Sequence, residues 1–189
     1  MKRSRFSVTL GSLGLTLLGA LGTARALDIK KDVKTFELTP VNAACLPEAS
    51  GSVIVFHTED ARGVDTLHLH VHGLPPNTDF AVFLTSEDAF AKPPFGVTDY
   101  IGDFTTNAEG IGSLKVDAII DEAFVTNPVP GTPPTRSRTD LDHLVFWFAD
   151  PAQVPACFNF LNATPFDGDG KAGPAAMSSS GATGLEQLP

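Results

Sequence analysis

Three histidines at alternate positions, which we call the histidine row, are the residues of this chain whose type and spacing could do chemistry. Residues 67–72 alternate leucine or valine with His68, His70 and His72. A period of two places the three imidazoles on one face of a strand and the apolar side chains on the other. Imidazole nitrogens bind copper and zinc. Residues two apart on a strand lie about 6.6 Å apart, so an adjacent pair can share one ion, whereas the ends of the row, about 13 Å apart, cannot.

A metal site on this row therefore needs two adjacent histidines and a ligand from another strand. His70 and His72 are the favoured pair, because they lie nearest the turn that starts at Gly73, where loops can bring in a third ligand. That ligand could be a nearby carboxylate or one of three residues elsewhere in the chain, namely His57, Asp142 and His143. The other interpretation of the row is a solvated sheet face. We therefore predict no cofactor, and a bound copper or zinc ion is the alternative.

The elements that must position these histidines are strands. Apolar, β-branched and aromatic runs separated by glycine, proline and asparagine turns predict an all-β chain, an antiparallel β-sandwich over residues 27–167. The predicted strands are residues 35–38, 52–57, 66–72, 79–85, 100–106, 112–119 and 141–149. The predicted core is Val53, Val55, Leu67, Leu69, Val71, Leu74, Phe80, Val82, Leu84, Phe104, Leu114, Val116, Leu144, Phe146 and Phe148.

The turn after the histidine row resembles a known corner. Residues 73–82 read Gly-Leu-Pro-Pro-Asn-Thr-Asp-Phe-Ala-Val and resemble the G-L-x-P-x-T-x-[YF]-x-[VL] corner of fibronectin type III domains. The resemblance implies an immunoglobulin/fibronectin III-like sandwich and no particular activity. Phe80 stands where that family usually has a tyrosine, so the corner should be held by packing and by Thr78. Residues 73–83, 102–107 and 141–151 are also similar to small exported bacterial proteins of uncharacterised role.

The His-x-His spacing is also similar to the copper-binding pair of copper/zinc superoxide dismutases. This chain has five histidines in all and lacks the downstream histidine-and-aspartate loop of that enzyme. It cannot ligate two metals in that pattern, so dismutase activity is not expected.

The two ends of the chain differ in composition from its middle. Lys2, Arg3 and Arg5 precede an apolar run that ends in Ala24-Arg25-Ala26. This order is typical of a secretory signal peptide cleaved near Ala26, so residues 1–26 are removed and the protein is secreted or periplasmic. No later segment is long and apolar enough to span a bilayer. Residues 168–189 are rich in glycine, alanine and serine and predict a flexible C-terminal tail.

Cys45 and Cys157 are the only cysteines of the chain. Export places them in an oxidising compartment, where an even count favours one disulfide. The alternatives are two free thiols or a pair of soft metal ligands.

Charge and motifs narrow the function further. The formal charge is −9 for the whole chain and −13 once the signal is removed, which disfavours nucleic acid and anionic lipid as partners. The sequence contains no G-x-S-x-G, H-E-x-x-H or Walker pattern, and no catalytic residue is predicted.

The leading hypothesis is an exported, non-catalytic sandwich that acts by surface binding or envelope association with an unknown partner. The alternatives are a copper or zinc protein that uses the histidine row, and a hydrolase whose acids come from separate strands.

Overall fold

A computed structural model of the chain describes residues 31–58, 63–86, 97–120, 122–127, 135–158 and 172–179. These residues form strands and one 3-10 helix and contain no α-helix, which confirms the all-β prediction. The elements in chain order are β1 (Lys31–Pro40), β2 (Ser50–Thr58), β3 (Asp65–His72), β4 (Asp79–Thr85), β5 (Thr98–Thr105), β6 (Gly112–Ala118), β7 (Glu122–Asn127), β8 (Thr135–Asp140), β9 (His143–Phe148), the 3-10 helix η1 (Pro151–Gln153) and β10 (Ala175–Ser178).

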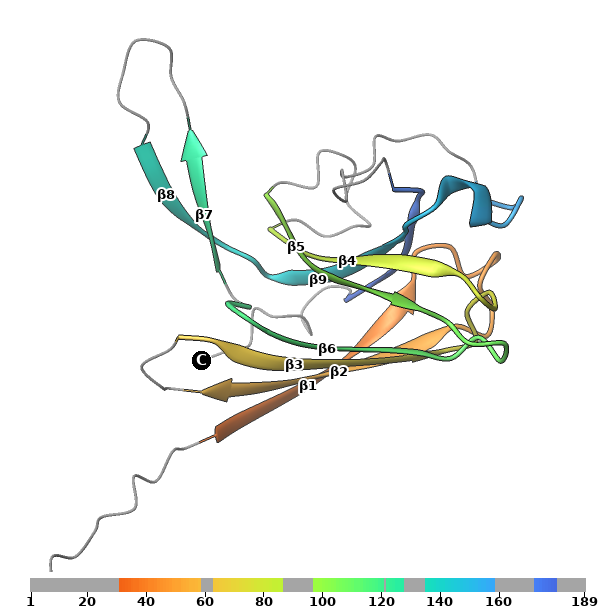
Figure 1. The fold of residues 1–189 in the computed structure, drawn as a ribbon, viewed down its shortest axis with the longest axis horizontal. Helices are drawn as coiled ribbons and strands as arrows, with labels where there is room; N and C mark the ends of the chain where they lie inside the picture. Colours follow the sequence, from red (N-terminus) through yellow and green to blue (C-terminus); the bar gives the residue numbers. More distant parts are fainter. Residues whose placement is uncertain are drawn as a thin grey trace, which may run out of the picture.

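One sheet folds over on itself to make two layers (Figure 1). Its strand order is β5-β4-β9-β10-β1-β2-β3-β6, and every pairing is antiparallel. One layer holds β1, β2, β3 and β6, and the other holds β5, β4, β9 and β10. Strand β1 joins the layers, because it pairs with β2 along most of its length and with β10 at Thr39 and Pro40. The predicted antiparallel sandwich is confirmed.

The strand order differs from that of immunoglobulin domains. In those domains the first sheet holds the first, second, fifth and fourth strands. Here β1, β2 and β3 follow one another in the same layer, and β6 lies beyond β3. The structure therefore has the antiparallel sandwich that the resemblance implies but not the strand order of immunoglobulin domains.

Inward-facing side chains of the two layers meet in one core. All of the predicted core residues are buried except Leu114 and Val116, which are partly buried and pack against that core. Phe80 is a central member, because its ring centroid lies 5.1 Å from Phe104, 5.3 Å from Phe146 and 5.0 Å from Phe148. The period-two patterns in the sequence therefore identify the buried faces correctly.

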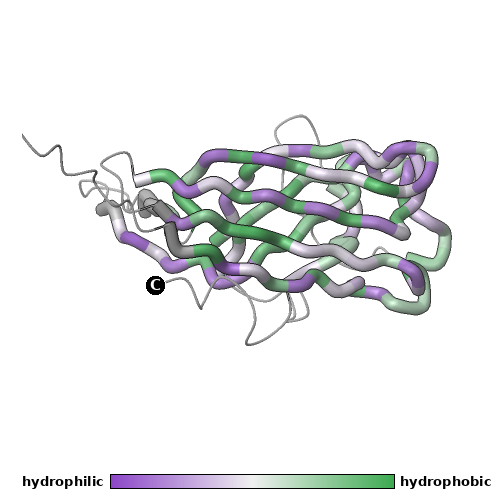
Figure 2. Tube along the Cα trace, turned by 90° about the horizontal axis from the view of Figure 1, so that it is seen from below, coloured by the Kyte–Doolittle hydropathy of each residue, from purple (hydrophilic) through white to green (hydrophobic). Residues whose placement is uncertain are grey.

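The outward faces of the two layers have different chemistry. Along β3, buried residues alternate with half-buried or exposed ones, and Figure 2, which views this layer from outside, shows hydrophobic and hydrophilic positions alternating. In β9 every residue is buried. The outward-facing Phe83, Val145 and Trp147 form a second apolar cluster, as the uninterrupted apolar runs of β4 and β9 dictate. The polar outward face of the described sandwich is thus the face of β1, β2, β3 and β6.

A tight corner carries the chain from β3 to β4. Gly73 has a φ of +71°, and a Cβ there would lie 2.0 Å from the carbonyl oxygen of Glu48, so only glycine fits. Thr78 is buried; its hydroxyl donates to the carbonyl of Pro76 at 3.1 Å, and its amide donates to the hydroxyl of Thr106 at 3.0 Å. The corner is held by packing and by Thr78, as its sequence indicates.

One prediction about the second half of the chain needs correction, and two strands there were not predicted. The predicted flexible tail includes β10, whose residues are all buried and pair with β9 and β1 inside the sheet. The tail prediction is therefore wrong for residues 172–179, while residues 168–171 and 180–189 lie outside the described part. No predicted strand covers residues 122–127 or 135–140, where the structure has β7 and β8. These two strands form a separate two-stranded ribbon that extends away from the sandwich (Figure 1).

The proposed signal peptide, residues 1–26, lies outside the described residues. In the part of the chain that the structure covers, no helix has the length and apolar character needed to cross a membrane.

Candidate functional site

The histidine row lies on the outward side of the β1-β2-β3-β6 layer, which we call the histidine face. Strand register places His68 between Ile54 and Lys115, and His70 between Ser52 and Ser113. His72 lies opposite Ser50. Because side chains on paired positions share a face, the row is flanked by hydroxyl groups at its corner end and by larger side chains at its other end.

His68 is the member of the row that is held by packing. Its ring meets that of Phe56 edge to face, with centroids 5.2 Å apart and an interplanar angle of 64°. The side chain is half-buried, whereas His70 and His72 are exposed. His68 therefore acts as a structural residue of the face, and the two histidines nearer the corner are the ones available to a ligand.

His72 is oriented by the neighbouring strand. Its Nε2 atom and the Oγ atom of Ser50 lie 2.6 Å apart and share a hydrogen bond. Ser50 begins β2, directly after the loop between β1 and β2, so the position of His72 depends on how that loop is held. Serine and histidine also form the nucleophile–base pair of many hydrolases, but such a pair needs a third group that orients the imidazole and N–H donors for an oxyanion. No described contact of His72 supplies either.

A hollow of about 490 Å³ lies on the histidine face and crosses its strands. The residues that line it are Glu37, Ser50, Gly51, Ser52, His70, Val71, His72, Ile111 and Gly112. Glu37 comes from β1, the two serines from β2 and the two histidines from β3, while Ile111 precedes β6 and is 51% exposed. Hydroxyl and imidazole groups can both donate and accept hydrogen bonds, and the carboxylate accepts them. The hollow therefore combines five polar side chains with the apolar residues Val71 and Ile111.

None of the three named candidates for the third metal ligand, His57, Asp142 and His143, joins the histidine pair. His57 lies on the inward side of β2, where its Nδ1 atom is 3.1 Å from a carboxylate oxygen of Asp65. His143 is buried in β9 of the other layer, and Asp142 precedes it there. That part of the metal prediction is wrong, because the register turns His57 inward and the layers separate the other two. Among the residues that the structure describes, no three His, Cys, Asp or Glu side chains gather as a metal-binding group.

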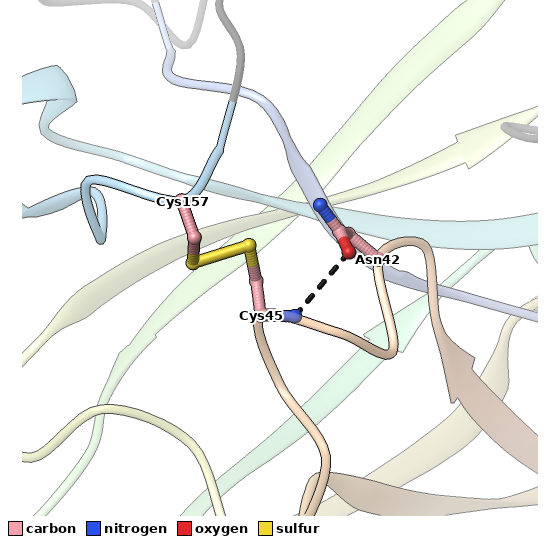
Figure 3. The surroundings of a disulfide bond; sticks show 3 residues. All are labelled: Asn42, Cys45 and Cys157. Atoms are coloured by element: carbon pink, nitrogen blue, oxygen red, sulfur yellow. Dashed lines mark hydrogen bonds between the residues drawn. A yellow bond between two sulfur atoms is a disulfide. The ribbon is translucent and has the colours of Figure 1, made fainter.

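A disulfide holds the loop that precedes Ser50. Cys45 and Cys157 are bonded, and their Cα atoms lie 5.7 Å apart (Figure 3). The carbonyl and side-chain oxygens of Asn42 both accept from the amide of Cys45, at 3.0 and 3.3 Å. Leu46 and Ala49 of the same loop are buried. The disulfide thus ties the entry to β2, and with it the histidine face, to the chain that follows η1.

Sequence reasoning missed the serines and the glutamate of the hollow. Ser50 and Ser52 alternate with residues that point inward, which is the same period of two that reveals the histidines. Glu37 alternates with the buried Phe36 and Leu38 in β1. These signals show which face each residue occupies. They do not show that the three strands are neighbours, which is a property of the folded sheet.

Comparison with known proteins adds no family to this description, because no protein-family model matches the chain and no curated protein matches it.

Proposed function

We propose that this chain is an exported, non-catalytic binding protein that holds a neutral glycan in the hollow of the histidine face. The observation that carries the proposal is the hollow itself, which five polar side chains from three neighbouring strands line together. Export is supported by the basic and apolar residues at the N-terminus. The corner that resembles fibronectin type III domains fits such a role, because extracellular sandwiches of this kind commonly work by surface contact.

The polar groups of the hollow suit a ligand rich in hydroxyl groups. Ser50, Ser52, His70 and His72 can each donate to or accept from a sugar hydroxyl, and Glu37 can accept from one. Ile111 offers an apolar contact for the C–H face of a sugar ring. The carboxylate of Glu37 and the formal charge of −9 repel anionic ligands, so a neutral glycan is favoured over an acidic one.

A panel of neutral and acidic soluble oligosaccharides tests this proposal. Wild-type protein should bind at least one neutral member, and the His70→Ala variant should bind it roughly five- to tenfold more weakly, the effect expected for losing one or two hydrogen bonds. Lys115→Ala is the matched control, because Lys115 lies on the same face but does not line the hollow. Failure of every neutral glycan to bind, or equal losses in both variants, would contradict the proposal.

A second candidate is Cu(II) or Zn(II) binding by His70 and His72. The observation that favours it is the exposure of both imidazoles at the same hollow, two residues apart on one strand. Binding would need neutral imidazole and ligands from solvent, and it should weaken as the pH falls below about 6. Calorimetric titration of protein purified without a polyhistidine tag tests it. A Kd tighter than about 100 μM that is lost in both His70→Ala and His72→Ala would support the candidate, whereas equal heats in all three proteins would exclude it.

A further inference from the structure

The two edge strands of the folded sheet face each other across an opening. Within the described part of the chain, β5 pairs with β4 alone and β6 pairs with β3 alone. The short turn that contains Asn107 and Gly110 keeps β5 and β6 together at one end. A cavity of about 410 Å³ lies between them at the other end, away from the hollow of the histidine face. Figure 1 shows the course of the two strands.

This cavity combines acidic groups with apolar ones. Asp99 lies opposite the buried Leu84, so its side chain is on the inward side of its layer, where it is partly desolvated although the residue is exposed. Desolvation by burial raises the pKa of Asp99. The apolar lining includes Tyr100 and Ile119, which are 44% and 40% exposed. A basic side chain bound beside Asp99 would compensate the carboxylate for lost hydration. Other residues of the same bound segment would cover Tyr100 and Ile119.

Two further carboxylates at the cavity already have partners. Asp117 accepts a hydrogen bond from the hydroxyl of Thr66 at 2.6 Å, and Glu122 forms an ion pair with Arg138. Asp117 still contributes negative potential, because a neutral donor leaves a carboxylate its charge, whereas the charge of Glu122 is offset by Arg138. A second copy of this chain would bring like charges together here and is therefore disfavoured.

The edge of β6 is the more regular of the two. Its pairing with β3 is continuous from Asp65–Ala118 to Val71–Gly112, whereas the pairing of β5 with β4 shifts register at Val82 and Phe83. Irregularities of this kind make an edge a poor template for another strand, while a regular edge presents unpaired N–H and C=O groups in sequence. An extended segment would pair with β6.

We propose that the opening between β5 and β6 receives an extended basic segment of a partner protein. The segment adds as a strand to the edge of β6 and places a lysine or arginine side chain in the cavity beside Asp99. Main-chain hydrogen bonds supply affinity, and the acidic cavity supplies selectivity for basic side chains. This surface is separate from the hollow of the histidine face and does not depend on the function proposed for that hollow.

Synthetic peptides test both parts of this proposal. The probe is a peptide of alternating lysine and valine, matched in length to β6, with a labelled end for anisotropy. We expect it to bind and to slow amide hydrogen exchange in β6. The same peptide with alternate amides N-methylated should bind about tenfold more weakly, because N-methylation removes the donors that strand addition needs. A glutamate–valine peptide should not bind.

Variants of the protein locate the binding. Asp99→Asn should weaken the lysine–valine peptide about fivefold at low salt. Glu109→Gln is the matched control, because Glu109 is an exposed acid in the turn between β5 and β6 and does not line the cavity. His70→Ala should leave peptide binding unchanged, which separates this surface from the hollow of the histidine face. Equal binding of the N-methylated peptide, equal effects of Asp99→Asn and Glu109→Gln, or unchanged amide exchange in β6 would each overturn the proposal.

Discussion

Ser50 Oγ lies 2.6 Å from His72 Nε2 across the β2–β3 pair. This contact joins the histidine row to the first residue of β2, and the disulfide of Cys45 holds the loop that leads to it. Gly73, directly after His72, approaches Glu48 of the same loop so closely that a Cβ would not fit. The corner end of the histidine face is therefore positioned by covalent and steric contacts that lie outside the face.

Removing the hydroxyl of Ser50 should affect binding more than stability. The Ser50–His72 hydrogen bond is exposed, so Ser50→Ala should change the free energy of unfolding by no more than about 1 kcal/mol. Glycan affinity should fall several-fold, because both the hydroxyl and the orientation of His72 are lost. Urea denaturation and glycan titration of the same preparation measure the two effects.

A fluorophosphonate probe should leave Ser50 unmodified. Covalent labelling at this residue would show instead that Ser50 and His72 act as a hydrolytic nucleophile and base.

Loss of the disulfide should destabilise the whole sandwich. Cys45 and Cys157 are separated by 112 positions in the sequence, and a cross-link over a loop of this length stabilises by roughly 4–5 kcal/mol in the chain-entropy treatment. The Cys45→Ser, Cys157→Ser double variant should therefore unfold at a much lower urea concentration. A thiol assay on denatured, unreduced wild-type protein should detect no free thiol. Two titratable thiols per chain would contradict the bonded state.

Phe146 should be among the most costly core residues to truncate. It is fully buried and its ring contacts those of Phe80 and Phe104. Phe146→Ala should cost roughly 3–5 kcal/mol of unfolding free energy. Val33→Ala is the control, since Val33 is 50% exposed and its truncation should stay within about 0.5 kcal/mol. Similar small losses for both variants would mean that Phe146 is not packed in the core.

Truncation should show that β10 belongs to the sandwich. Ending the chain after Asp167 removes β10, which lies between β9 and β1 and contains the fully buried Met177. The melting temperature should fall by more than about 10 °C, or the protein should fail to fold, because the contact between the two layers is lost. Ending the chain after Ser179 retains β10 and is the matched control. Equal melting temperatures for the two truncations would contradict this and would mean that residues 172–179 belong to a flexible tail.

The sequence predicts those parts of this fold that local periodicity determines. The alternation at residues 67–72 identifies both the outward histidines and the inward Leu67, Leu69 and Val71. It cannot identify β10, because Ala175, Ala176 and Ser178 have weak strand preference and are buried by strands that are distant in sequence.

The residues of the site also divide into those that local periodicity predicts and those that depend on non-local strand pairing. That His70 and His72 share a face can be read from their spacing. That Glu37, Ser50 and Ser52 line the same hollow depends on the order and register of β1, β2 and β3. The sequence alone allows His57 as a third ligand, whereas the register of β2 places its side chain on the inward side, next to Asp65. Strand neighbours form by non-local pairing, which a single sequence does not reveal.

Mapping of a bound neutral glycan by backbone amide NMR shifts tests the central claim most directly. We expect the largest shifts at Ser50, Ser52, His70, His72 and Ile111, and none at the cavity between β5 and β6. The His70→Ala variant should show the same pattern only at higher glycan concentration. Shifts centred on any other surface, or an unchanged response in His70→Ala, would contradict the assignment of the histidine face as the binding site.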